Sequence, residues 1–151
     1  MLSKTLTEQI LQNKIPIHLW HTRDWLRARR QGQIERLLPL LRLPAMTWLR
    51  KRFPNRWQGA KTCNLSVWRE DILRVNGLDE SYTGWGLEDS DLVIRLLRAG
   101  IYNKSARFSV PVFHLWHREN DRSNLQENRQ RLQQVLKATH IKAIQGMDQH
   151  R

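Results

Sequence analysis

The feature that constrains the fold most is one helix signal, GLEDSDLVIRLLRAG, in residues 86–100. Three acids stand at its start, where a helix dipole favours negative charge. Gly100 stands at its end, where a glycine closes a helix in the left-handed conformation. The residues between them repeat at the three- and four-residue spacing of one helical face: Leu92, Val93, Leu96 and Leu97. The spacing predicts a firm helix over residues 88–99.

Weaker signals predict three further helices. One is expected over residues 3–14, with Ser3 or Thr5 as its cap and Leu6, Ile10 and Leu11 as its apolar stripe. A second is expected over 69–75, because Asn76-Gly77 is a strong turn signal. A third is expected from Ser123, in a capping box with Gln126, to about Ile144, followed by frayed residues.

Strand signals complete the expected α/β (α+β) fold. Residues 59–68 and one or two segments within 101–117 read as strands. Prolines favour short helices and loops between residues 18 and 56. We expect a basic helical and loop segment over 1–58, a central portion over 59–122 and a C-terminal helix over 123–151.

The net charge of the chain limits the classes of partner that it is expected to bind. Among 151 residues, 26 are Lys or Arg and 14 are Asp or Glu, which gives a formal net charge of +12. Such a balance indicates an anionic partner: nucleic acid, an acidic membrane surface or a phosphorylated ligand. The single cysteine, Cys63, fits a reducing compartment. No transmembrane segment or signal peptide is recognised, so a cytoplasmic protein is expected.

The loop GWGLEDSD, residues 84–91, allows two interpretations. Helix capping explains one or two of its carboxylates. Capping does not explain Gly84 and Gly86 around Trp85, because paired glycines permit positive φ or a close approach of a ligand. Tryptophan beside carboxylates suits a carbohydrate, whose apolar face packs on the ring while the acids accept its hydroxyls.

A family resemblance rests on the longer run NLSVWREDILRVNGLDESYTGWGLEDSDLVIRLLRAG. This run resembles the C-terminal half of a GT-A type glycosyltransferase, similar to the family 2 enzymes and to the galactosyltransferase C-terminal domain. Leu78 stands where the family usually has Phe. The resemblance implies a partial GT-A fold whose N-terminal nucleotide-binding half is missing, and therefore a truncated enzyme.

The resemblance also implies roles for single residues in an inverting transfer of a hexose. Asp89 takes the position of the general base, Glu88 would hydrogen-bond a sugar, and Asp91 would anchor the loop to its helix. Trp85 would stack on the sugar. The substrate-binding residues implied beside it are Gly84, Gly86, Asn64, Asp79 and Glu80.

Two histidines, His114 and His117, follow in the run VPVFHLWHREN. Isolated, such a pair more often consists of polar side chains at a strand end than of metal ligands. The resemblance implies that His117 ligates Mn²⁺, or Mg²⁺, bound to a nucleotide diphosphate, with His114 as a second ligand or support. The implied substrates are a nucleotide sugar, such as a UDP-hexose, and a saccharide or lipid-linked saccharide acceptor in cell-surface polysaccharide or lipopolysaccharide synthesis.

Two other hypotheses remain open from the sequence. A basic module could hold RNA or DNA through the arginines of residues 23–56 and through several of the seven tryptophans. This hypothesis leaves the acidic loop unexplained, so nucleic acid is the less favoured partner. An inactive fragment is the other hypothesis. A basic face also suits an enzyme at the surface of an anionic membrane.

Overall fold

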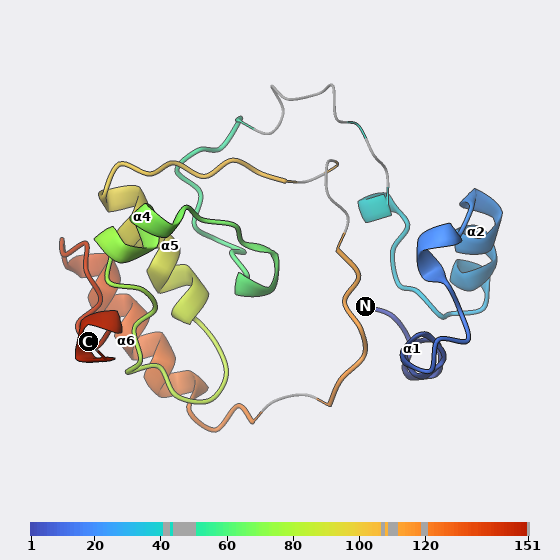
Figure 1. Ribbon diagram of the computed structural model, residues 1–151. Helices are drawn as coiled ribbons and strands as arrows, with labels where there is room; N and C mark the ends of the chain where they lie inside the picture. Colours follow the sequence, from blue (N-terminus) through green and yellow to red (C-terminus); the bar gives the residue numbers. More distant parts are fainter. Residues whose placement is uncertain (41–42, 44–50, 107, 109–111, 119–120, 151) are drawn as a thin grey trace. The chain divides into compact units, whose positions relative to one another are not determined.

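The computed structural model describes residues 1–40, 43, 51–106, 108, 112–118 and 121–150 (Figure 1). Its α-helices are α1 (Lys4–Leu11), α2 (Thr22–Arg30), α4 (Arg69–Arg74), α5 (Glu88–Arg98) and α6 (Leu125–Lys137). Short 3-10 helices span Ile17–Leu19, Leu38–Leu40, Thr62–Asn64 and Met147–His150. Within this described part, no helix has the length and apolar character needed to cross a bilayer.

The predicted α/β (α+β) class and partial GT-A fold are wrong, because the described residues are helical and contain no strand or sheet. Their one bridge pairs Leu2 with Ile34. The predicted strand at 59–68 contains a 3-10 helix, and the described part of 101–117 has no regular structure, residues 107 and 109–111 lying outside it. A strand needs a neighbouring strand as hydrogen-bond partner. Here Trp116 N donates instead to the Thr7 hydroxyl, at 2.9 Å.

The chain divides into two compact units. Unit 1 comprises Met1–Arg50 with Ser105–Glu119, and unit 2 comprises Lys51–Lys104 with Asn120–Arg151.

Unit 1 is built around α1 and α2. The predicted Ser3 cap is confirmed, since its hydroxyl accepts a hydrogen bond from Leu6 N at 3.2 Å. The core contains Leu2, Leu6, Ala28 and Ile34, and several half-buried aromatic and aliphatic side chains pack against it. Leu11, expected on the buried stripe of α1, is instead 67% exposed.

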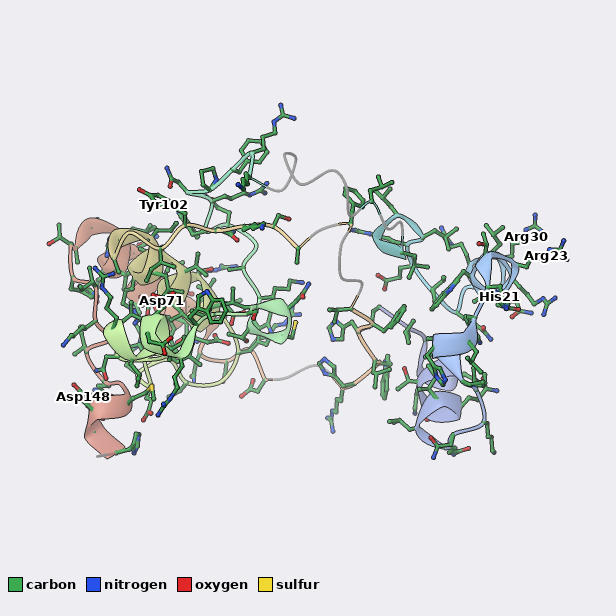
Figure 2. All side chains as sticks on the ribbon, turned by 45° about the horizontal axis from the view of Figure 1, so that its top comes forward. His21, Arg23, Arg30, Asp71, Tyr102 and Asp148 are labelled. Carbon is green, nitrogen blue, oxygen red and sulfur yellow. The ribbon has the colours of Figure 1, made fainter. Side chains whose placement is uncertain are left out.

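The helix α2 separates its apolar and basic residues. Ala28 and Trp25 pack in the core of unit 1. The four arginines of the helix are exposed, and Figure 2 shows Arg23 and Arg30 extending away from it. The basic side chains of α2 are therefore directed away from the core of unit 1.

Unit 2 is built around α5, which confirms the predicted helix over residues 88–99. One side of α5 packs Leu92 and Leu96 against Val75 and Ala99. Another packs Ile94 against Leu132 and Val135 of α6. Gly100 follows the helix at φ 83°, the left-handed conformation predicted for it.

The helix α6 is shorter than predicted at both ends. Ser123 does not form the expected capping box; its amide and hydroxyl both donate to the Asp121 carboxylate. At the other end, Arg98 donates to Val135 O in the last turn of the helix, at 2.7 Å, and to His140 O beyond it, at 3.3 Å. The residues after α6 are not frayed, because they bond to the turn at 75–80.

Candidate functional site

The Asn76–Glu80 turn is held by the C-terminal segment. Asp79 is 7% exposed, and its two carboxylate oxygens accept backbone amides from Ser81 at 3.0 Å and Ile144 at 3.1 Å. Burial alone would raise the pKa of Asp79, but the hydrogen bonds from Ser81 and Ile144, with the nearby Arg95 guanidinium, lower it. The Asp79 carboxylate, implied to bind substrate, is thus occupied by contacts within the protein.

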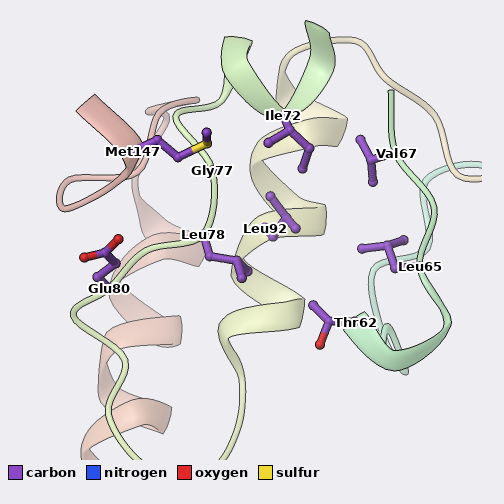
Figure 3. Close-up of a pocket in the computed structure, with 9 residues that line it drawn as sticks. All are labelled: Thr62, Leu65, Val67, Ile72, Gly77, Leu78, Glu80, Leu92 and Met147. Carbon is purple, nitrogen blue, oxygen red and sulfur yellow. The ribbon is translucent and has the colours of Figure 1, made fainter. Parts of the chain in front are cut away.

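Glu80 lines an open pocket of about 500 Å³ in unit 2 (Figure 3). Most of the pocket wall is apolar: Leu65, Val67, Ile72, Leu78, Leu92 and Met147. The Glu80 carboxylate contacts His150 Nε2 at 2.7 Å. Asn64, the other implied substrate residue of this region, is exposed at the end of the Thr62–Asn64 helix.

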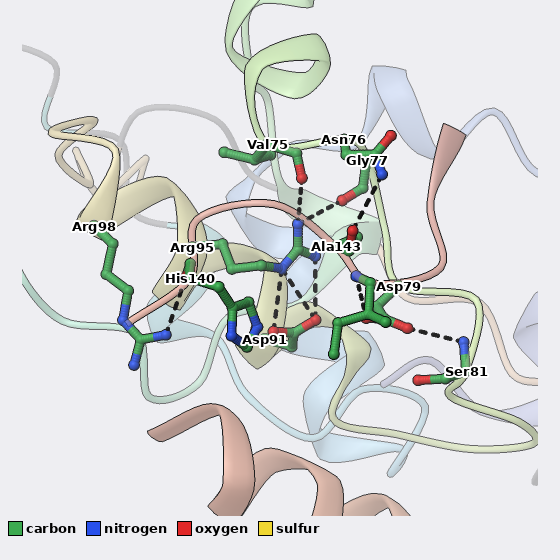
Figure 4. Close-up of polar contacts among 11 residues, drawn as sticks. Val75, Asn76, Gly77, Asp79, Ser81, Asp91, Arg95, Arg98, His140 and Ala143 are labelled. Carbon is green, nitrogen blue, oxygen red and sulfur yellow. Dashed lines mark hydrogen bonds and ion pairs between the residues drawn. The ribbon is translucent and has the colours of Figure 1, made fainter. Parts of the chain in front are cut away.

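Asp91 and Arg95 form a fully buried ion pair that joins α5 to the turn (Figure 4). The Arg95 guanidinium donates to both Asp91 oxygens, at 3.1–3.2 Å. It also donates to Val75 O at 2.7 Å and to Gly77 O at 2.9 Å. Burial raises the pKa of Asp91, and Arg95 opposes the shift. Asp91 therefore has a structural position at the base of the acidic loop.

The Gly84–Gly86 loop is fixed by α6. Gly84 and Gly86 have φ values of 72° and 103°, which glycine adopts readily. Asn128, 1% exposed, donates from Nδ2 to Thr83 O at 3.0 Å and to Trp85 O at 3.4 Å. The sequence analysis did not identify Asn128 as a site residue, because no local pattern links it to a loop more than 40 residues earlier.

Trp85 lies at the surface of this loop. The residue is 41% exposed, and the Arg122 guanidinium lies 4.6 Å from the ring centroid. A cation over an aromatic face restrains the ring. The loop thus presents a held but accessible tryptophan, which is suited to packing against a sugar.

Glu88 and Asp89 begin α5, and both are partly exposed. Neither carboxylate has a hydrogen bond or ion pair with another described residue, and Asp89 Oδ1 is buried without a partner. Three more buried atoms of unit 2 lack partners among the described residues: Tyr82 Oη, Asn128 Oδ1 and Arg131 Nε. All four atoms come from residues 82–89 and from the helix that holds this segment. Their hydrogen-bonding capacity is not used by the described residues.

Burial raises the pKa of Tyr82 strongly, and the Asp91 and Asp79 carboxylates raise it further. Its hydroxyl is therefore neutral and able both to donate and to accept a hydrogen bond.

His114 and His117 belong to unit 1, whereas the acidic loop belongs to unit 2. Their Nε2 atoms lie 3.0 Å apart, and His117 Nδ1 donates to Arg118 O at 2.8 Å, which leaves the lone pair on His117 Nε2. Neighbouring nitrogen ligands about 2.1 Å from an octahedral metal have a similar separation. No group of three or more potential ligands occurs within the described ranges. In this structure the two Nε2 atoms form a hydrogen bond with each other, and together they offer two nitrogens.

Comparison with known proteins finds similarity in the part of the chain that contains this loop. Residues 45–118 match a family model described as the N-terminal domain of galactosyltransferase. Two curated proteins are each 47% identical to 30% of this chain, over 45 residues. Both are named validoxylamine A glucosyltransferase, from Streptomyces hygroscopicus subsp. jinggangensis (strain 5008) and subsp. limoneus.

The matched regions cover only 11% and 10% of these two relatives, so the match spans about a tenth of their length. No solved structure matches the chain. The resemblance to galactosyltransferases is nevertheless confirmed, since residues 45–118, which include the GWGLEDSD loop, match this glycosyltransferase family model.

Proposed function

We propose that this chain is part of an inverting, metal-dependent glycosyltransferase that transfers a hexose from a nucleotide sugar, such as a UDP-hexose, to a saccharide or lipid-linked saccharide. The family match supports the class of reaction. One observation carries the assignment of the base: Asp89 is partly exposed and its carboxylate has no partner among the described residues, whereas Asp79 and Asp91 are occupied by contacts within the protein. A base must keep its oxygen available for the substrate proton. The biosynthetic setting is that of cell-surface polysaccharide or lipopolysaccharide.

In the proposed reaction, Asp89 accepts the proton of an acceptor hydroxyl while that oxygen attacks the anomeric carbon of the donor. The bond between the anomeric carbon and the diphosphate oxygen breaks, and the nucleoside diphosphate leaves with the bonding electron pair. Because attack and departure occur on opposite faces, the configuration inverts. Glu88 accepts a hydrogen bond from a sugar hydroxyl, and Trp85 packs against the apolar face of the ring.

The metal in this proposal is Mn²⁺ or Mg²⁺, and His117 with His114 would supply its protein nitrogens. When bound, the metal neutralises charge on the leaving diphosphate. The hydrogen bond from His117 Nδ1 to Arg118 O keeps His117 Nε2 unprotonated for this role.

The test of the base is release of UDP by the 151-residue chain from a panel of UDP-hexoses, with Mn²⁺ and saccharide acceptors. Asp89→Asn should lower transfer at least about a thousandfold and leave saccharide binding, followed by ligand-detected NMR, within about threefold. Asp71→Asn is the matched control, because Asp71 also stands in a first helical turn without a side-chain partner among the described residues. Retained transfer by Asp89→Asn would contradict the base assignment. A wild-type chain that binds neither UDP nor any saccharide would contradict the proposed function.

The metal assignment has a separate test. Mn²⁺ binding is followed by electron paramagnetic resonance, and UDP binding by thermal shift with and without Mn²⁺. His117→Ala should abolish both signals, whereas His18→Ala, another exposed histidine of unit 1, should leave them unchanged. Equal Mn²⁺ binding by the two variants would exclude His117 as a ligand.

A further inference from the structure

We infer that the outer face of α2 binds the surface of an anionic membrane. This face is the side of the helix away from the core of unit 1, and it carries Arg23, Leu26, Arg27 and Arg30. The inference does not depend on the proposed glycosyl transfer, because it rests on unit 1 alone.

The helical spacing places these four residues together. A turn of α-helix takes 3.6 residues, so positions 23, 26, 27 and 30 lie on one face and positions 25 and 28 on the opposite one. Burial agrees with this geometry, since Ala28 is buried and Trp25 packs on the core while all four outer residues are exposed. The side chains of Arg23 and Arg30 extend from the helix in Figure 2.

The charge of the outer face is hardly neutralised within the protein. Across the described ranges, Arg23 and Arg30 have no ion pair, and Arg27 has one long contact of 4.0 Å with Asp24. A cluster of exposed arginines on a short helix attracts anionic lipid headgroups, and the attraction falls off within a Debye length.

An exposed leucine within this basic face favours a membrane over a nucleic acid. Leu26 is 45% exposed between the arginines, where it can enter the boundary between headgroups and acyl chains. Stacking on bases would need open aromatic faces. The nearby tryptophans are not open in this way, because Trp25 packs against Trp20 with ring centroids 4.8 Å apart and against Phe113 with centroids 5.1 Å apart.

The experiment is co-sedimentation of the full chain with vesicles of phosphatidylcholine and phosphatidylglycerol in equal parts, and with phosphatidylcholine alone. Binding is expected to the mixed vesicles only and to weaken with added salt. The triple variant Arg23→Gln, Arg27→Gln, Arg30→Gln should bind roughly a hundredfold more weakly. Leu26→Ser should weaken binding about tenfold while leaving the salt dependence in place. Circular dichroism confirms that each variant keeps its helix content.

The control triple removes the same charge from exposed arginines of unit 2: Arg69→Gln, Arg74→Gln and Arg129→Gln. It should keep binding within about threefold of the wild type. Equal losses in the two triples would mean that net charge alone drives binding and would overturn the assignment to α2. Absence of vesicle binding would also overturn it. A third result would overturn it: the wild-type chain binds a single-stranded oligonucleotide but no vesicles, and the α2 triple variant loses the oligonucleotide binding.

Discussion

At the scale of single residues, two buried carboxylates of unit 2 illustrate opposite outcomes of burial. Burial would raise the pKa of both Asp79 and Asp91. Asp79 accepts two backbone amides as well, and its pKa falls; Asp91 lies deeper, and its pKa stays raised in spite of Arg95. The direction of each shift is the balance between the burial of the carboxylate, which is deeper for Asp91, and the hydrogen bonds and charge around it.

The lowered pKa of Asp79 predicts a pH dependence of stability. The folded pKa lies below the ordinary value of 3.8, so Asp79 stabilises the fold above that value and loses this contribution as the pH falls through the folded pKa. Asp79→Asn should cost about 1–3 kcal/mol at neutral pH and flatten the loss of stability in acid. Urea unfolding at a series of pH values measures both effects. If Asp79→Asn lost stability with falling pH as steeply as the wild type and Asp71→Asn, the stabilising role of the Asp79 carboxylate would be contradicted.

Arg95 is expected to matter more than any other charged side chain of unit 2. Arg95→Met leaves Asp91 buried without its partner and removes the donors to Val75 O and Gly77 O. The free energy of unfolding should fall by about 3–5 kcal/mol. The double variant with Asp91→Asn should recover part of this loss, because it removes the uncompensated charge. Equal stability of the single and double variants in urea unfolding would show that the ion pair is not the cause.

At the scale of elements, the candidate site depends on α6 as much as on α5. Asn128→Ala should free the segment around Trp85 and raise its rate of amide hydrogen exchange, at a cost of about 1–3 kcal/mol. Asn124→Ala is the control, since Asn124 has a single exposed contact with the Thr83 hydroxyl. Exchange of residues 82–91 that is equal in the two variants would contradict the anchoring role of Asn128.

At this scale, helix ends that depend on neighbouring residues were predictable from the sequence, and contacts between residues far apart in the chain were not. Ser3, Gly100 and the Asn76-Gly77 turn act on their own neighbours, and the helix ends expected from them occur. The strand predictions failed because a strand depends on a partner, and the described residues contain no second strand for either segment. At the early end of α6, Val135 O accepts a hydrogen bond from Arg98, which lies 37 residues earlier in the chain.

The acidic loop itself was recognisable from its order of residues, and the structure adds which acids stay available. A carboxylate used by the fold and one left for a ligand look alike in a sequence. Asp89 and Asp91 are two positions apart but differ in their contacts. Arg95, one turn after Asp91 on the same side of the helix, pairs with Asp91, and Asp89 has no such partner among the described residues.

At the scale of the whole molecule, each unit has its own core, and mutations should report on the unit that contains them. Leu6 is fully buried in unit 1, so Leu6→Ala should cost about 2–5 kcal/mol there. Hydrogen exchange of α1 and α2 should speed up accordingly. Leu11→Ala, on the same helix but 67% exposed, should have little effect. Equal effects of the two variants would contradict the observed orientation of α1.

The Asn76-Gly77 turn has a consequence for the chemical ageing of the protein. An asparagine before glycine deamidates when its side-chain carbonyl carbon is attacked by the next backbone nitrogen. Here the Asn76 amide is bound to Ala143 O, Asp148 Oδ1 and Asp148 N, and Gly77 N donates to Ile72 O. Deamidation should therefore be slow in the folded chain and fast once the C-terminal segment detaches. The fraction of deamidated Asn76, measured by mass spectrometry of stored samples, would then report how much time the turn has spent open.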